Sequence, residues 1–173
     1  NAIITLIKNE IKDIEKGIIR TPLDPTKTYN DDPLRMMRAI RFATQLNFSI
    51  EETSYMAIKD NASRLSIISQ ERITEELNKI ILTSKPSIGF NLLLETNLLR
   101  QFFPEFVNLK GVDTIGKHQH KDNFYHTLEV LDNISNKTTN HDLKFPYKIR
   151  ELLWFWKFID KIVSNKKDID NSK

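Results

Sequence analysis

Apolar residues recur at helical spacing along most of this 173-residue chain, and this repeat constrains the fold more than any other feature. Segment 70–82 is the clearest case, because Ser69 stands at its N-cap position and its isoleucine and leucine residues fall on one face. That face consists of Ile73, Leu77, Ile80 and Ile81. Further helices are expected over 32–45, 51–60, 88–95, 122–134 and 146–163. We therefore predict an all-α fold.

The composition excludes several classes of protein. Cysteine is absent, which rules out disulfides, thiol catalysis and cysteine-ligated zinc. Four glycines leave little room for a glycine-rich dinucleotide motif. No apolar run approaches the roughly 20 residues of a membrane span, and no signal peptide opens the chain, so we expect a cytoplasmic protein without a membrane partner. The formal net charge of +3 is small, so any nucleic-acid role must depend on where the charges lie.

Three arginines repeat every third residue in the helix expected over 32–45. Arg35, Arg38 and Arg41 form one stripe on that helix, and Asp32 lies one turn before Arg35. A carboxylate beside a guanidinium presents the acceptor and donors needed to read the edge of a nucleobase, and further arginines suit phosphates. The alternative is an exposed helix with ordinary ion pairs. The residues expected to face a core from another side of this helix are Met36, Met37 and Ile40.

Segment 31–42 resembles the Glu/Asp-Asp-x-x-Arg motif of the tRNA CCA-adding enzyme and poly(A) polymerase family of nucleotidyltransferases. Segments before and after it resemble other parts of the same family, in the same order along the chain. Residues 16–22 resemble the end of the flexible-loop motif of the catalytic head, and residues 65–82 resemble the neck helix. Residues 91–106 resemble the helical body, and residues 117–127 resemble the entry to an HD domain.

The resemblance implies roles for particular residues. Asp32 and Arg35 are expected to select the incoming CTP or ATP, and Arg38 and Arg41 to support the same nucleotide site. The partner implied by the family is the 3′ end of tRNA, with Arg72 and Lys79 as the expected RNA contacts. The intact family enzyme also uses Mg²⁺.

The chain departs from the family pattern in its catalytic residues. The family holds its metal with an Asp-x-Asp pair on a strand of the head, and no such pair precedes Asp32. The later Asp168-Ile169-Asp170 lies in a polar tail and is interpreted as solvated coil. Asn1-Ala2 matches the end of a head motif, so we expect the chain to begin inside the head and to be inactive alone. The expected parts are a head remnant (1–28), neck and body (29–110), an incomplete HD-like region (111–164) and a disordered tail (165–173).

Three histidines, His118, His120 and His126, fall within nine residues and suit a transition metal. His126 matches the early histidine of HD-type phosphohydrolases and is the candidate ligand, but His141-Asp142 stands in a polar segment rather than in an apolar helix. The alternative is a packed helical His126 with the other histidines on surface loops.

Three functions remain open from the sequence. The first is part of a tRNA CCA-adding nucleotidyltransferase that supplies base selection and tRNA binding. The second is a noncatalytic helical module that binds RNA or a protein. The third is a fragment of an HD-type metal phosphohydrolase.

Overall fold

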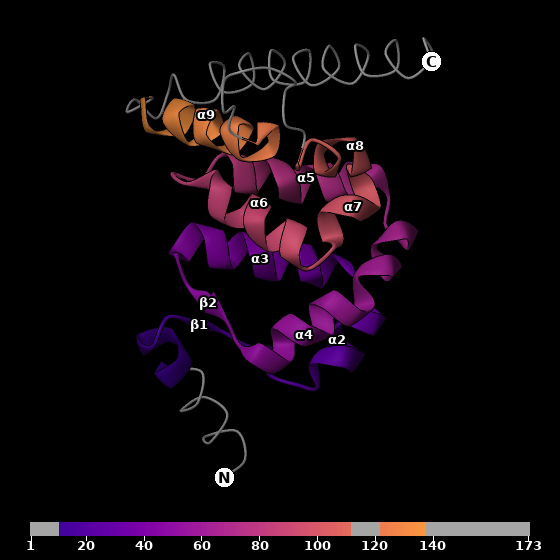
Figure 1. Cartoon of the computed structure of the whole chain (residues 1–173). Helices are drawn as coiled ribbons and strands as arrows, with labels where there is room; N and C mark the ends of the chain where they lie inside the picture. The colour runs from indigo at the N-terminus through magenta and orange to yellow at the C-terminus, as the bar shows by residue number, and fades with distance from the viewer. Residues whose placement is uncertain (1–10, 112–121, 138–173) are drawn as a thin grey trace, which may run out of the picture. The chain divides into compact units, whose positions relative to one another are not determined.

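The structure, a computed structural model, describes residues 11–111 and 122–137 (Figure 1). Its elements in chain order are β1 (Ile18–Ile19), α2 (Pro25–Asp31), α3 (Leu34–Leu46), β2 (Ser49–Ile50), α4 (Glu52–Asn61), the 3₁₀ helix η1 (Ala62–Ile67), α5 (Gln70–Ile81), α6 (Pro86–Glu95), α7 (Leu98–Phe102), α8 (Pro104–Val107) and α9 (Asn123–Lys137). Within these residues the only sheet is the two-residue parallel pair of β1 and β2. The predicted all-α fold is confirmed.

The helix ends follow from local chemistry. Asn47 adopts a left-handed conformation with φ of 54° and ends α3. Ser69 stands at the predicted N-cap of α5, although its side chain makes no capping hydrogen bond. Pro86 occupies the first turn of α6, so this helix begins two residues before the predicted start.

The two prolines in residues 21–25 are typical of a loop, and residues 21–24 form one. Pro25 instead begins α2, a helix not predicted from the sequence, because Asp24 caps it by accepting a hydrogen bond from the Lys27 amide at 2.7 Å. Asn30 and Asp31 belong to the last turn of α2, and α3 begins at Leu34, two residues after the expected start. Asp32 precedes this helix, where its side chain accepts a hydrogen bond from the Leu34 amide and its carbonyl accepts one from the Arg35 amide. The 3₁₀ helix η1 was also not predicted.

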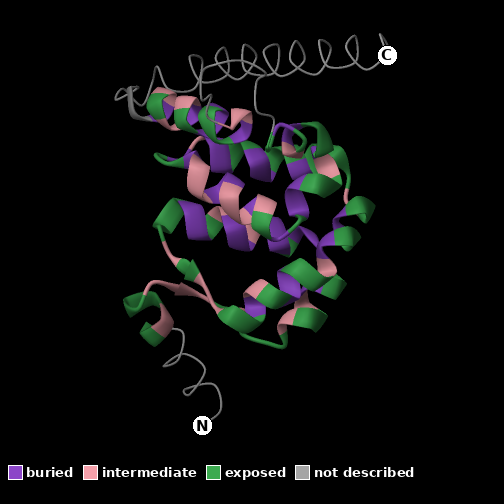
Figure 2. Cartoon of the chain, viewed as in Figure 1, coloured by how far each residue is buried: buried purple, intermediate pink, exposed green. Residues whose placement is uncertain are grey.

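The chain divides into two compact units between Pro104 and Glu105. In the first unit α3 packs against both α5 and α6, and α2 packs against α4. Met36, Met37 and Ile40 of α3 are fully buried, as predicted, and Figure 2 shows the buried and exposed sides of this helix. The predicted apolar face of α5 is buried as well.

The second unit has its own small apolar cluster. The rings of Phe106 and Phe124 lie 4.7 Å apart, and Leu128 and Leu131 of α9 are buried. None of the helices within the described ranges combines the length and apolar character that a bilayer crossing requires. The expected helix over 146–163 and the tail over 165–173 lie outside the described residues.

Gly89 allows α6 to lie close to both α3 and α5. A Cβ at this position of α6 would lie 2.5 Å from Ile80 Cγ2 of α5 and 2.7 Å from Thr44 Oγ1 of α3. Thr44 is buried, and its hydroxyl donates to the Ile40 carbonyl at 2.8 Å. Only a residue without a side chain permits this contact.

Glu51 caps helix α4 of the first unit. Its Oε2 accepts hydrogen bonds from the Ser54 amide at 2.9 Å and from the Thr53 hydroxyl at 2.7 Å. Burial raises the pKa of Glu51, but these hydrogen bonds outweigh it and lower the pKa to about 2. Because the folded pKa is below the ordinary value of 4.5, the stabilisation is present above pH 4.5 and is lost as pH falls toward 2.

Replacing Gly89 with alanine should lower the free energy of unfolding by about 1–2 kcal/mol. Overpacking costs about 1–3 kcal/mol and exceeds the roughly 1 kcal/mol that alanine gains over glycine in a helix. Urea denaturation measures the effect, with Asn91→Ala in the same helix as a control that should change stability by less than about 0.5 kcal/mol. A Gly89→Ala protein as stable as the wild type would contradict the close approach.

Replacing Glu51 with alanine should lower the free energy of unfolding by about 1 kcal/mol at neutral pH, because α4 loses its cap. The difference from the wild type should shrink as pH falls from 4.5 to about 2, where the wild-type carboxylate also becomes protonated. Denaturation across this pH range tests the cap, with the exposed neighbour Glu52→Ala as the matched control. A difference that is independent of pH would show that the carboxylate charge is not what stabilises α4.

Candidate nucleic-acid interface

Asp32 and Arg35 lie side by side at the junction of α2 and α3. The Asp32 Oδ2 and Arg35 Nε atoms are 3.7 Å apart, which is an ion-pair distance but too long for a hydrogen bond. The side chains are 28% and 52% exposed, respectively. The structure therefore brings the two predicted residues together without consuming the guanidinium donors of Arg35.

Backbone contacts fix the carboxylate of this pair. Asp32 ends α2 in an extended conformation, and its Oδ1 accepts a hydrogen bond from the Leu34 amide at 3.2 Å. The Arg35 amide donates to the Asp32 carbonyl at 3.0 Å. From η1, the guanidinium of Arg64 donates to the Asn30 carbonyl at 3.0 Å and so ties down the last turn of α2. The acceptor oxygen Oδ2 is thus held in place beside Arg35.

The other two arginines of the stripe converge on Glu76 of α5. Arg41 Nε lies 2.9 Å from Glu76 Oε2, and Arg38 Nε lies 3.9 Å from Oε1. Lys79, one turn further along α5, donates to Oε1 at 2.9 Å. The Arg41 and Glu76 atoms are close without hydrogen-bond geometry, so the contact is an ion pair rather than a directed bond. We call Arg38, Arg41, Glu76 and Lys79 the Glu76 cluster.

The Glu76 cluster leaves an excess of positive charge at the surface. Glu76 is buried, with a side chain only 5% exposed, whereas the side chains of Arg38 and Lys79 are each more than two fifths exposed. Three cations share one carboxylate, so this part of the α3–α5 seam attracts anions such as phosphates. Arg72, one turn before Glu76 on α5, is also exposed.

Arg41 has a different environment from the rest of the arginine stripe. Its side chain is only 16% exposed, and its guanidinium lies 4.1 Å from the centre of the Phe42 ring. The expected role of Arg41 in nucleotide binding stays a prediction, while the observed contacts connect α3 to α5.

Glu76 is a residue of this site that the charge and apolar patterns considered above do not identify. A signal was available, because Glu76 is three residues after Ile73 and four before Ile80, and both of these isoleucines were placed on the buried face. A carboxylate at such a position requires cationic or hydrogen-bonding partners.

The structure describes little of the expected metal site. His126 is exposed on α9, so it is not the packed helical histidine of the alternative interpretation. Both oxygens of Asp122 accept backbone hydrogen bonds, from Gly111 at 2.7 Å and from Phe124 at 2.9 Å. Across residues 11–111 and 122–137, no three histidine, cysteine or acidic side chains gather closely enough to hold a metal ion. His118, His120, His141-Asp142 and Asp168–Asp170 lie outside these ranges.

Comparisons with known proteins agree on one family. Residues 47–109 match the family described as "Probable RNA and SrmB-binding site of polymerase A". A CCA-adding enzyme of Pediococcus pentosaceus is 36% identical over 159 residues, which are 90% of this chain and 38% of that protein. The mitochondrial CCA tRNA nucleotidyltransferase of Candida glabrata is 33% identical over 147 residues, covering 83% of this chain and 27% of that protein. The chain therefore spans well under half the length of these curated relatives.

Solved structures show the same fold. The Bacillus stearothermophilus CCA-adding enzyme in complex with CTP matches 93% of this chain and 39% of its own, with a TM-score of 0.57 and 25% identity. A CCA-adding enzyme solved with ATP matches 79% of this chain and 35% of its own, with a TM-score of 0.50 and 22% identity, and supports the fold alone. Together with the sequence relatives, these matches show that the chain belongs to the family of CCA-adding enzymes and poly(A) polymerases.

Proposed function

We propose that this chain supplies nucleotide selection and RNA binding to a tRNA CCA-adding nucleotidyltransferase, which transfers nucleotidyl groups from CTP and ATP to an RNA 3′ end. The observation that carries the proposal is the solvent-accessible Asp32–Arg35 pair, in which Asp32 Oδ2 lies 3.7 Å from Arg35 Nε. Support comes from relatives that are described as CCA-adding enzymes and from the related structure solved with CTP.

The chemistry of the pair explains a preference for cytosine and adenine. Both bases carry an exocyclic amine beside a ring nitrogen that accepts a hydrogen bond. Asp32 Oδ2 accepts from the amine, and the guanidinium of Arg35 donates to the ring nitrogen. Uracil and guanine present a carbonyl oxygen and a ring N–H at the same places, so the carboxylate would face an oxygen and the guanidinium would face a donor. One site therefore accepts two bases and rejects two.

The positive α3–α5 seam supplies the second part of the function. Arg38 and Lys79 are exposed members of the Glu76 cluster, and Arg72 lies on the same helix as Lys79. Such cations suit the phosphates of RNA or of a nucleoside triphosphate. The match of residues 47–109 to an RNA-binding family includes α5 and supports this role.

Magnesium belongs to the proposed enzyme as the ion that activates the RNA 3′ hydroxyl and neutralises the triphosphate. The described residues do not fit such a site, because no three acidic or histidine side chains gather among them and both Asp122 oxygens accept hydrogen bonds from backbone amides. We therefore assign no catalytic step through the metal to this part of the chain.

Nucleotide titrations of the chain, followed by NMR, test base selection. CTP and ATP should bind more tightly than UTP and GTP, and Arg35→Lys should reduce this preference by about tenfold, because an ammonium lacks the planar donors of a guanidinium. Asp32→Asn should reduce it similarly, since the amide replaces one acceptor oxygen by a donor. The matched control is Arg100→Lys on α7, which should leave the preference unchanged. Equal binding of the four nucleotides, or an unchanged preference in Arg35→Lys, would contradict the proposal.

A further inference from the structure

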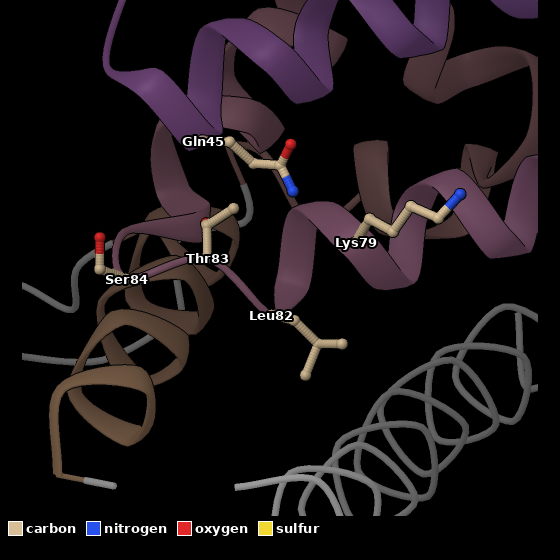
Figure 3. Close-up of a pocket in the computed structure, with 5 residues that line it drawn as sticks. All are labelled: Gln45, Lys79, Leu82, Thr83 and Ser84. Carbon is tan, nitrogen blue, oxygen red and sulfur yellow. The ribbon is translucent and has the colours of Figure 1, made fainter. Parts of the chain in front are cut away.

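A pocket of about 220 Å³ lies where the C-terminal ends of α3 and α5 meet (Figure 3). It is lined by Gln45, Lys79, Leu82, Thr83 and Ser84. Figure 3 shows the Gln45 amide extending from α3 over the end of α5, while the Lys79 side chain runs along α5. The ammonium of Lys79 reaches Glu76, so one residue joins the pocket to the Glu76 cluster.

The position of the pocket separates it from the Asp32–Arg35 pair. Gln45 is ten residues after Arg35 in the same α-helix, which corresponds to about 15 Å along the axis. The volume is below the roughly 300–1,000 Å³ of pockets that hold drug-sized ligands. The pocket therefore suits one sugar or one base and is too small for a second nucleoside triphosphate.

The polar groups of the pocket favour a neutral ligand that carries hydroxyl groups. Gln45 and Ser84 are exposed, so the Gln45 amide and the Ser84 hydroxyl are open to a ligand, whereas the Thr83 hydroxyl donates to the Ile80 carbonyl at 2.7 Å. Both α3 and α5 end here, and the partial negative charge of helix C-termini disfavours an anion inside the pocket. At its edge, however, Lys79 and the rest of the Glu76 cluster favour an anion.

A ribose between two phosphates meets both requirements, because its hydroxyls are neutral donors and its phosphates are anions. We propose that the pocket holds a ribose of a bound RNA strand. In this arrangement Gln45 and Ser84 form hydrogen bonds with the 2′-hydroxyl, and Lys79 contacts the adjacent phosphate. The inference rests on the proposed RNA-binding function and deepens it, since the 2′-hydroxyl is the group by which a protein distinguishes RNA from DNA.

Fluorescence anisotropy with a short labelled single-stranded RNA ending in CC, and with the DNA of the same sequence, tests the pocket. The wild-type chain should bind the RNA more tightly than the DNA. Gln45→Ala should weaken RNA binding by about 2- to 10-fold, the range expected for one lost hydrogen bond, and should leave DNA binding unchanged. Lys79→Ala should weaken binding of both strands, because both carry phosphates, and should reduce the dependence of affinity on salt.

The matched control is Gln101→Ala, which removes an exposed glutamine from α7, away from the pocket lining. Equal effects of Gln45→Ala and Gln101→Ala on RNA binding, or equal wild-type affinities for RNA and DNA, would overturn the ribose pocket while leaving RNA binding intact. Failure of the chain to bind either strand would contradict the proposed function itself, and the pocket assignment with it.

Discussion

The buried carboxylate of Glu76 is the constraint on which the rest of the interface depends. A charge with a side chain only 5% exposed is costly unless cations surround it, and Arg38, Arg41 and Lys79 supply that environment from two helices. Because Arg38 and Arg41 belong to α3 and Lys79 belongs to α5, satisfying Glu76 fixes these helices against each other. The same contacts leave the outer donors of Arg38 and Lys79 in solvent, where a phosphate can reach them.

Helix α3 consequently serves the core and the interface at once. One side buries Met36, Met37 and Ile40, and Gly89 of α6 allows a close approach near the C-terminal half. The N-terminal end carries Arg35 beside Asp32, whose position follows from the end of α2 and its backbone contacts. A rigid support matters for base reading, because a misplaced donor or acceptor rejects the correct base as readily as the wrong one.

Much of this arrangement follows from local sequence patterns. The spacing of apolar residues predicted α3, α5 and α9, and the separation of three residues between Asp32 and Arg35 correctly placed them in contact. The spacing of apolar residues alone does not predict α2, although Asp24 before Pro25 is a local capping signal. Tertiary contacts decide the exposure of the arginines, because Glu76 of another helix pairs with Arg41 and leaves its side chain only 16% exposed. The pocket at Gln45 joins residues more than 30 positions apart, which no local pattern reveals.

The most direct test of this account is a double-mutant cycle between Arg41 and Glu76, with the free energy of unfolding as the readout. Glu76→Gln and Arg41→Met should each lower the free energy of unfolding, because each single change leaves part of a buried charge unpaired. The loss in the double variant should be smaller than the sum of the two single losses by more than about 1 kcal/mol. Effects that add to within about 0.3 kcal/mol would show that the two side chains do not depend on each other. The seam between α3 and α5 would then have to be held by its apolar contacts alone.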